Sequence, residues 1–281
     1  MIEIHKSQTS DEFWDSIKDE IIHMYADERM STNKIGEKYG CWDTTIQYKL
    51  KEWGVPKNTR PNSLYTLNEN YFEIIDNEHK AYWYGFLLAD GHVNESVIML
   101  TLKKEDEYII EEYKHDLEAG APLSYDKYGN AGLNIACKKM CNDLITKGFH
   151  HRKSDYLDID KVVSYVPSNL EHHFIRGMFD GDGCVGLYNY AYLSKPQCHF
   201  GYTGLENVCK YVGDKLNIHT KMQDESELIK TIKTRDNVLI SNIMDYLYKD
   251  ATIYLDRKYT KFRYIKLITF NDYNGNIPKV G

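Results

Sequence analysis

The sequence lacks the features that mark membrane, secreted and zinc-binding proteins. No apolar run approaches the ~20 residues of a membrane-spanning helix, and no signal peptide is evident. The six cysteines form no paired framework, and Cys137 and Cys141 have no second pair at zinc-binding spacing. These absences predict a globular cytoplasmic protein with free thiols.

A basic excess is also missing. The chain has 35 lysines and arginines against 42 aspartates and glutamates, a formal net charge of −7 that does not favour a nucleic-acid partner. DNA contact requires only a locally basic face. Basic residues do cluster at 138–139, 150–153 and 257–263. The charge therefore permits a DNA partner without supporting one.

One stretch of the chain occurs twice. Residues 81–93, AYWYGFLLADGHV, return in altered form as residues 174–185, FIRGMFDGDGCV. Four pairs of residues share one offset, 182 − 90 = 92: Gly85 with Gly177, Ala89 with Gly181, Asp90 with Asp182, and Gly91 with Gly183. A single offset for all four pairs indicates a repeated unit.

Each copy is typical of a helix that stops abruptly. Aromatic and aliphatic residues fill its turns, and a glycine after the aspartate is a usual C-terminal stop signal. The two small residues of each copy lie four apart, which places them on one face where a partner backbone can approach closely. If these faces pack together, Asp90 and Asp182 come side by side. Two such carboxylates repel each other unless a cation is present, and hard divalent cations suit oxygen ligands. For one copy alone, a core helix with a solvated aspartate is the better explanation.

The paired motif resembles that of the LAGLIDADG homing endonucleases, in their single-chain form with two motifs. Trp83–Gly91 and Ile175–Gly183 stand where the family's nine-residue motif stands, and the resemblance covers residues 64–265 or so. It implies an α+β fold of two pseudo-symmetric αββαββα repeats, which form a saddle over DNA. Two positions depart from the pattern: Leu88 stands where the second copy has Asp180, and Arg176 occupies an often apolar position.

The element order agrees with this fold. Strands are expected at 92–102, 122–138, 184–193, 198–202 and 222–234, and helices at 105–117, 139–147, 205–216 and 237–248. Residues 71–160 would form the first repeat and residues 161–281 the second. The resemblance implies a monomer with pseudo-two-fold symmetry, whose strands after each motif contact the major groove.

The resemblance also implies the catalytic chemistry. Asp90 and Asp182 would be metal ligands, one for each DNA strand, with the backbone carbonyls of Gly91 and Gly183 as additional ligands. Magnesium is the expected cation and manganese the alternative.

A basic side chain is expected beside each metal site, where it would orient the attacking water. Lys153 and Lys258 are the candidates by their place in the repeat, and Lys261 is an alternative to Lys258. Both lysines are equally compatible with a solvated or phosphate-contacting role.

Residues 1–54 are expected to form a separate helix-turn-helix module, joined by a linker at 55–70 that contains Pro56 and Pro61. Ser31 and Asp43 are the expected N-caps of its second and third helices. The third helix would enter the major groove. The side chains expected to face DNA are Thr44, Thr45, Gln47, Tyr48 and Lys51, whereas Ile46, Leu50 and Trp53 face inward. A three-helix module that docks on protein is the alternative.

Two functions from different classes follow. The first is a metal-dependent endonuclease of a mobile genetic element that cuts both strands of a long asymmetric DNA site. The second is a DNA-binding regulator that kept the fold and lost cutting. Retention of both aspartates favours the enzyme, because a regulator gains nothing obvious from two apposed carboxylates. A role in protein splicing or RNA maturation is a distant third, since no splicing residues flank the domain.

Overall fold

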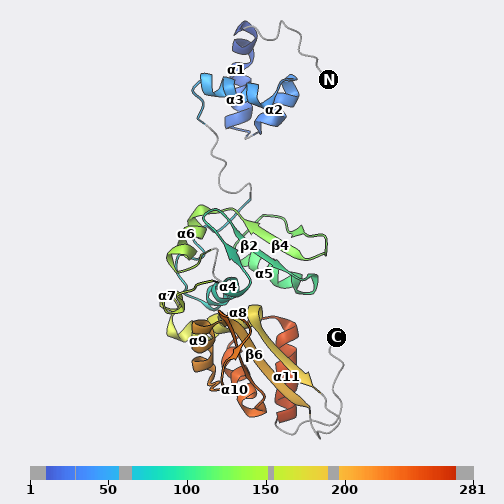
Figure 1. The fold of residues 1–281 in the computed structure, drawn as a ribbon. Helices are drawn as coiled ribbons and strands as arrows, with labels where there is room; N and C mark the ends of the chain where they lie inside the picture. Colours follow the sequence, from blue (N-terminus) through green and yellow to red (C-terminus); the bar gives the residue numbers. More distant parts are fainter. Residues whose placement is uncertain (1–10, 29, 57–64, 151–154, 189–195, 270–281) are drawn as a thin grey trace. The chain divides into compact units, whose positions relative to one another are not determined.

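The structure is a computed structural model that describes residues 11–28, 30–56, 65–150, 155–188 and 196–269 (Figure 1). The chain divides into two compact units, Met1–Leu64 and Tyr65–Gly281. The smaller unit is all helical in its described part, and the larger one contains both sheets.

The smaller unit packs its helices around an apolar core that includes Trp14, Ile21, Ile35, Ile46 and Leu50. Its helices are α1 (Asp11–Ala26), α2 (Thr32–Tyr39) and α3 (Asp43–Glu52). These three helices lie where the sequence predicts them.

The turn between α2 and α3 is tight. Gly40 ends α2 in the left-handed conformation at φ 66°, where glycine carries no steric penalty. Ser31 caps the start of α2 as predicted, since its hydroxyl accepts a hydrogen bond from the Lys34 amide. The predicted cap Asp43 is wrong. Trp42 holds the N-cap position, and the Asp43 carboxylate instead accepts a hydrogen bond from Gln47 inside the helix.

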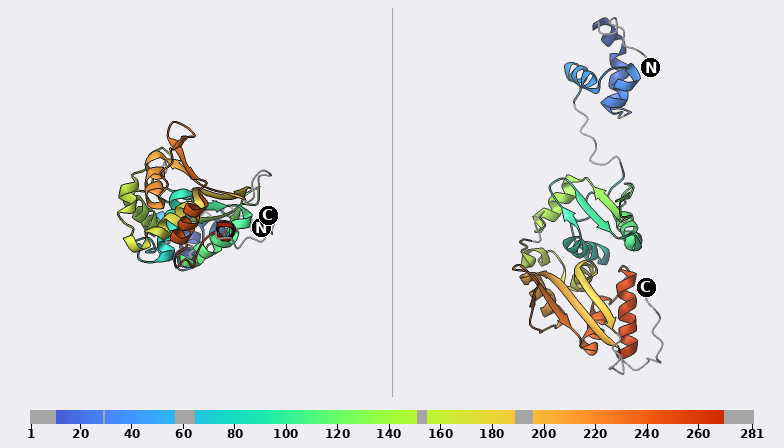
Figure 2. Two further views of the ribbon diagram at one scale, coloured as in Figure 1. Left: turned by 90° about the horizontal axis from the view of Figure 1, so that it is seen from below. Right: turned by 45° about the vertical axis from the view of Figure 1, so that its right-hand side comes forward.

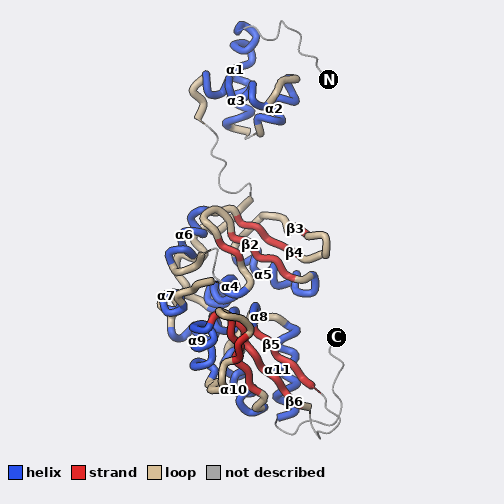
Figure 3. The backbone as a smooth tube through the Cα atoms, in the orientation of Figure 1, coloured by secondary structure: helices blue, strands red, loops and turns tan. Residues whose placement is uncertain are grey.

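The larger unit is α+β, as predicted, with two antiparallel four-stranded sheets (Figure 3). The first sheet has the order β1-β2-β4-β3 and the second the order β5-β6-β8-β7. The elements of the first half are α4 (Glu78–Ala89), β1 (His92–Val93), β2 (Ile98–Leu102), η2 (Lys104–Asp106), α5 (Glu107–Asp116), β3 (Ser124–Tyr125), β4 (Ala131–Ile135) and α6 (Lys138–Thr146). Those of the second half are α7 (Ile159–Val163), η3 (Ser168–Leu170), α8 (Glu171–Asp182), β5 (Gly183–Tyr188), β6 (Gln197–Leu205), α9 (Glu206–Leu216), β7 (Gln223–Asp224), β8 (Ile229–Thr234), α10 (Asn237–Leu247) and α11 (Asp256–Thr269).

Each sheet buries one face. In β2, Ile98, Leu100 and Leu102 are buried, whereas Thr101 between them is exposed. This alternation follows from the two-residue period of a strand, and it is the pattern on which the strand predictions rest. One face of each sheet is therefore covered by helices and the other carries polar side chains.

Two helices of the larger unit, α7 and α11, were not predicted. Helix α11 runs along strand β5 (Figure 2). Its buried residues Phe262, Ile265 and Ile268 recur every three positions, so the helical period was present in the sequence.

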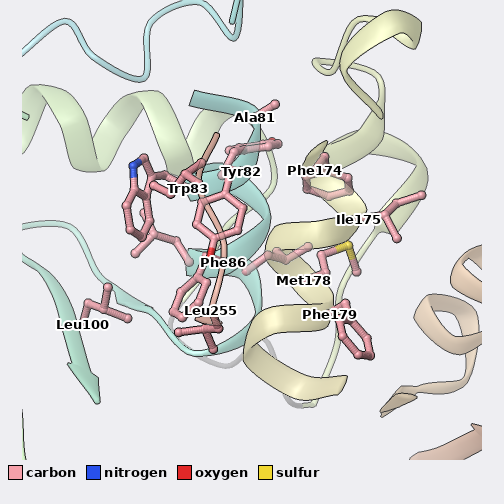
Figure 4. Close-up of a cluster of buried hydrophobic side chains, with 14 of the residues drawn as sticks. Ala81, Tyr82, Trp83, Phe86, Leu100, Phe174, Ile175, Met178, Phe179 and Leu255 are labelled. Atoms are coloured by element: carbon pink, nitrogen blue, oxygen red, sulfur yellow. The ribbon is translucent and has the colours of Figure 1, made fainter. Parts of the chain in front are cut away.

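Helices α4 and α8 pack side by side at the centre of the larger unit, as Figure 4 shows. A Cβ added to Gly85 would lie 2.0 Å from the carbonyl oxygen of Phe174. A Cβ added to Gly177 would lie 2.0 Å from the carbonyl oxygen of Tyr82. Because backbone stands where a side chain would begin, only glycine permits this approach. The predicted contact of the small-residue faces is present.

Phenylalanine and other large side chains surround this contact. Tyr82, Phe86, Phe174 and Met178 all lie in the buried cluster around the two helices (Figure 4). Burial of each such side chain contributes about 1.5–3 kcal/mol.

The glycines after the two aspartates do not act as left-handed caps. Gly183 is extended, at φ −83° and ψ 158°. A Cβ there would lie 2.1 Å from the Phe179 ring, and one at Gly91 would lie 2.7 Å from the Leu87 carbonyl oxygen. After each aspartate the backbone lies against the last turn of the preceding helix. A side chain there would collide with that turn, so both positions require glycine.

A compensating pair of substitutions tests the contact nearest the aspartates. A Cβ added to Gly181 would lie 2.3 Å from the Cβ of Ala89, a side-chain atom, and no closer than 3.4 Å to Asp90. We expect Gly181→Ala to destabilise the protein by about 1–3 kcal/mol. The double variant Gly181→Ala/Ala89→Gly should recover most of that loss, because the colliding methyl is gone.

Urea unfolding of the two single variants and the double variant measures this coupling. If Gly181→Ala and the double variant lose the same free energy of unfolding, the methyl group of Ala89 is not what crowds a side chain at position 181.

Candidate active site

Asp90 and Asp182 lie at the adjoining ends of the two central helices. Asp90 is the residue that follows α4, and Asp182 is the last residue of α8. The position of a Cβ on Gly181, the neighbour of Asp182, is 3.4 Å from Cγ of Asp90. The side chain of Asp90 thus lies against the segment that carries Asp182, as the repeat predicts.

Tyr202 is a tyrosine whose pKa both aspartates affect. It lies in β6 and is only 2% exposed. Burial raises the pKa of its hydroxyl far above the ordinary value, and the negative charges of Asp182 and Asp90 raise it further. The register of β6 on β5 places Tyr202 opposite Gly183. Both carboxylates therefore act on one buried tyrosine, which the sequence analysis missed because a tyrosine in a strand is an ordinary core residue.

The donor set fits a hard divalent cation that keeps most of its waters. No group of three or more histidine, cysteine, aspartate or glutamate side chains suited to a metal occurs among the residues that the structure describes. Two carboxylates with nearby backbone carbonyls are a small oxygen-only set. Mg²⁺ is commonly held by one or two carboxylates, whereas zinc sites are usually built around cysteine and histidine ligands.

Lys258 is buried at the C-terminal end of α8. Its Nζ donates to the carbonyl oxygens of Phe179 at 2.7 Å, Asp180 at 2.6 Å and Gly183 at 2.6 Å. Burial lowers the pKa of this lysine to about 8, although the charges of Asp180 and Asp90 oppose that shift. The carbonyl of Gly183, which the resemblance implies as a metal ligand, is thus an acceptor for Lys258.

Lys153 and Lys261 are the other basic residues that the sequence analysis names. Lys153 falls outside the described residues. Lys261 is half-buried. Burial raises the pKa of the Cys184 thiol, and the positive charge of Lys261 partly opposes that rise. Since Cys184 directly follows Gly183 in β5, Lys261 is also near the site.

A half-open pocket of about 260 Å³ adjoins Asp182. It lies between the two central helices and the end of β6, and Leu88, Met178, Thr203 and Val208 are among its lining residues. Asp182 is thus at the boundary between the buried helix pair and open space.

Arg176, the departure from an apolar position, is fully buried in a network of polar groups. Its guanidinium donates to Glu78 at 2.7 Å and to the carbonyls of Leu247 at 2.9 Å and Ile253 at 3.0 Å. Burial lowers the pKa of the neighbouring His173 to about 4, and the charge of Arg176 lowers it too. The neutral imidazole therefore accepts a hydrogen bond from the guanidinium at 2.6 Å. This network joins the start of α4 to the second half.

The predicted DNA-facing residues of α3 lie on its outer side. The side chains of Gln47, Tyr48 and Lys51 are exposed, as is Thr44, whereas Thr45 is half-buried. Ile46 and Leu50 are buried and Trp53 packs on the same core, as predicted. Trp42 is 81% exposed beside this face, which sequence analysis did not anticipate.

Comparison with solved structures shows the fold of the larger unit. The LAGLIDADG homing endonuclease I-LtrWI, solved bound to target DNA, has a TM-score of 0.52 and 14% identity, over 70% of this chain and 93% of that one. The LAGLIDADG homing endonuclease I-GzeII, in complex with its DNA target, has a TM-score of 0.51 and 13% identity, over 71% and 93%. At these identities the likeness establishes the fold alone.

No family model matches the sequence, and neither does any curated protein. Among the described residues, no helix is both long and apolar enough to cross a membrane.

Proposed function

We propose that this protein is a site-specific DNA endonuclease that hydrolyses phosphodiester bonds on both strands of a long asymmetric duplex with divalent metal ions. The observation that carries the proposal is the pairing of Asp90 and Asp182 at the ends of two glycine-packed helices. The fold around them is one that DNA-bound LAGLIDADG homing endonucleases share. A mobile genetic element is the expected source of such an enzyme.

The two carboxylates would hold the metal, one for each strand. A bound divalent ion lowers the pKa of a water ligand and stabilises the charge that develops on the phosphate. The carbonyls of Gly91 and Gly183 are proposed as further ligands, with magnesium as the cation and manganese as the alternative.

The open faces of the two sheets supply candidate DNA contacts. His92, Thr101 and Asn134 are exposed in the first sheet, and Thr203 is exposed in the second. Their side chains are short and polar, which suits hydrogen bonds to base edges in the major groove.

The test is a selection from a randomised duplex library with the full chain and magnesium, with EDTA as the matched control. We expect one defined double-strand cut that EDTA abolishes. Tight binding of a specific sequence without cutting, in magnesium and in manganese, would overturn the proposal. The chain would then be a DNA-binding regulator.

The N-terminal unit is proposed to add a second DNA contact through α3. The support is the exposed polar face of that helix, the tight turn before it and the exposed Trp42. If α3 enters the major groove, the residues of its first turns face base edges.

Substitution of that face should weaken binding without moving the cut. We expect Gln47→Ala to cost about 1–3 kcal/mol of affinity for the selected site, and Lys51→Ala to reduce the salt dependence of binding. Lys18→Ala on α1 is the matched control and should bind normally. Fluorescence anisotropy with the selected duplex measures both effects, and unchanged affinity in Gln47→Ala and Lys51→Ala would favour protein docking instead.

A further inference from the structure

The ammonium of Lys258 has no donor left for a substrate or a water. An ammonium group carries three N–H donors. Three short contacts, to the carbonyls of Phe179, Asp180 and Gly183, use all of them, and the Gly181 carbonyl lies at 3.4 Å. Two of these four carbonyls, of Gly181 and Gly183, flank Asp182 directly.

Lys258 therefore occupies the place of a helix C-cap. The last carbonyls of a helix have no partner within the helix, and a positive charge there is favourable. Asp182 belongs to the same turn. Lys258 holds carbonyls on both sides of Asp182, those of Phe179 and Asp180 before it and that of Gly183 after it, and so limits where the Asp182 side chain can point.

Asp180 lies in the same last turn of α8, where burial raises the pKa of its carboxyl group and the charge of Lys258 lowers it. It is fully buried, and its Oδ2 accepts hydrogen bonds from the Tyr82 hydroxyl and the Leu255 amide, both at 2.9 Å. Leu255 is labelled in Figure 4 beside the two helices. Its amide lies three residues before Lys258, so Asp180 also fixes the chain that leads into α11. A buried ammonium is tolerated when a carboxylate and hydrogen bonds offset the loss of water.

The two halves of the molecule differ at this point. The residue that matches Asp180 in the first copy is Leu88, 180 − 92 = 88, and it is a buried apolar side chain. Asp90 therefore lacks the carboxylate that supports the turn of Asp182.

We propose that Asp180 and Lys258 are a positioning pair that holds Asp182 in its metal-binding orientation, and that this pair serves one of the two strand-cleaving sites. Lys258 then acts through α8 and does not contact the attacking water. The inference rests on the proposed endonuclease function for its strand assignment, and on the hydrogen bonds above for the positioning itself.

The test compares Lys258→Met with the wild type and with Lys266→Met, a matched change on the exposed side of α11 that breaks only the surface pair with Asp245. In Lys258→Met we expect faster hydrogen exchange of the amides of residues 179–185, the end of α8 and the start of β5. Binding of Mn²⁺ should weaken by about 10–100-fold when measured on the Asp90→Asn background, which leaves only the Asp182 site. Lys266→Met should match the wild type in both measurements.

Strand-specific cleavage separates positioning from general structural damage. The strand whose cutting is lost in Asp182→Asn should be cut about 100-fold more slowly in Lys258→Met, with the other strand near its wild-type rate. Asp180→Asn keeps the acceptor and the shape, and should show the same strand bias to a smaller degree. That variant also serves if Lys258→Met does not fold.

Equal slowing of both strands, or unchanged exchange and Mn²⁺ binding in Lys258→Met, would overturn the positioning role. If the wild type cuts no DNA, the endonuclease proposal fails, while exchange and Mn²⁺ binding still decide whether Asp180 and Lys258 order the turn of Asp182.

Discussion

Replacement of Gly85 or Gly177 by alanine is expected to destabilise the larger unit strongly. The added Cβ would lie 2.0 Å from a backbone carbonyl oxygen of the facing helix in either case. Neither backbone can move aside without separating the two helices. We expect a loss at or above the upper end of the overpacking range, about 3 kcal/mol, in each variant.

The matched control is Gly213→Ala in α9, another helical glycine, whose Cβ would come no closer than 3.2 Å to the Ile218 carbonyl. A small change is expected there, because crowding of that size is offset by the better helix propensity of alanine. Urea denaturation followed by circular dichroism gives the free energies of unfolding. Stability losses in Gly85→Ala and Gly177→Ala no larger than in Gly213→Ala would contradict the close packing of α4 on α8.

The second large effect is expected in Asp90→Asn and Asp182→Asn. Each substitution removes one negative charge from the proposed metal-binding pair with little change in shape. We expect each to reduce cutting of one strand by at least about 100-fold, because metal-assisted charge stabilisation contributes several kcal/mol. Either variant should therefore nick the duplex instead of cutting it.

Thermal unfolding adds a readout that does not depend on cutting. Without metal, each variant should be as stable as the wild type or more so, because the repulsion between two nearby carboxylates is relieved. Magnesium should raise the Tm of the wild type and raise it less in the variants. Asp160→Asn, on the exposed surface of α7, is the control and should behave as the wild type in every assay. If Asp90→Asn or Asp182→Asn cuts both strands at the wild-type rate, the carboxylates have no part in the mechanism.

Much of the fold followed from local patterns. The alternation of buried and exposed residues located the strands, and the repeated small residues located the helix contact. The prediction of Asp43 as a cap was wrong because the turn at Gly40 is followed by an extended residue, Trp42, which places Asp43 inside the first turn. Caps depend on where the backbone leaves the helical conformation, and sequence locates that point only to within a residue or two.

The polar groups around the candidate site were harder to foresee. Arg176 was recognised as a departure from the apolar pattern, yet its partner Glu78 is 98 residues away in the chain. Asp180 was noted only as the residue that matches Leu88, although it is buried with the Tyr82 hydroxyl and the Leu255 amide. No period or spacing connects such residues, because they meet only when α4, α8 and the chain before α11 pack together.

The sequence alone determined the repeat with its offset of 92 residues, the glycines of the helix contact and the pair of aspartates that follow them. These features are local, because each depends on residue types at short, regular spacings. Tertiary structure alone decided that Tyr202 lies near both aspartates, and that Lys258 donates to the carbonyls around Asp182. Its Nζ bonds to residues 75–79 positions earlier in the chain, a separation at which only packing brings donor and acceptor together.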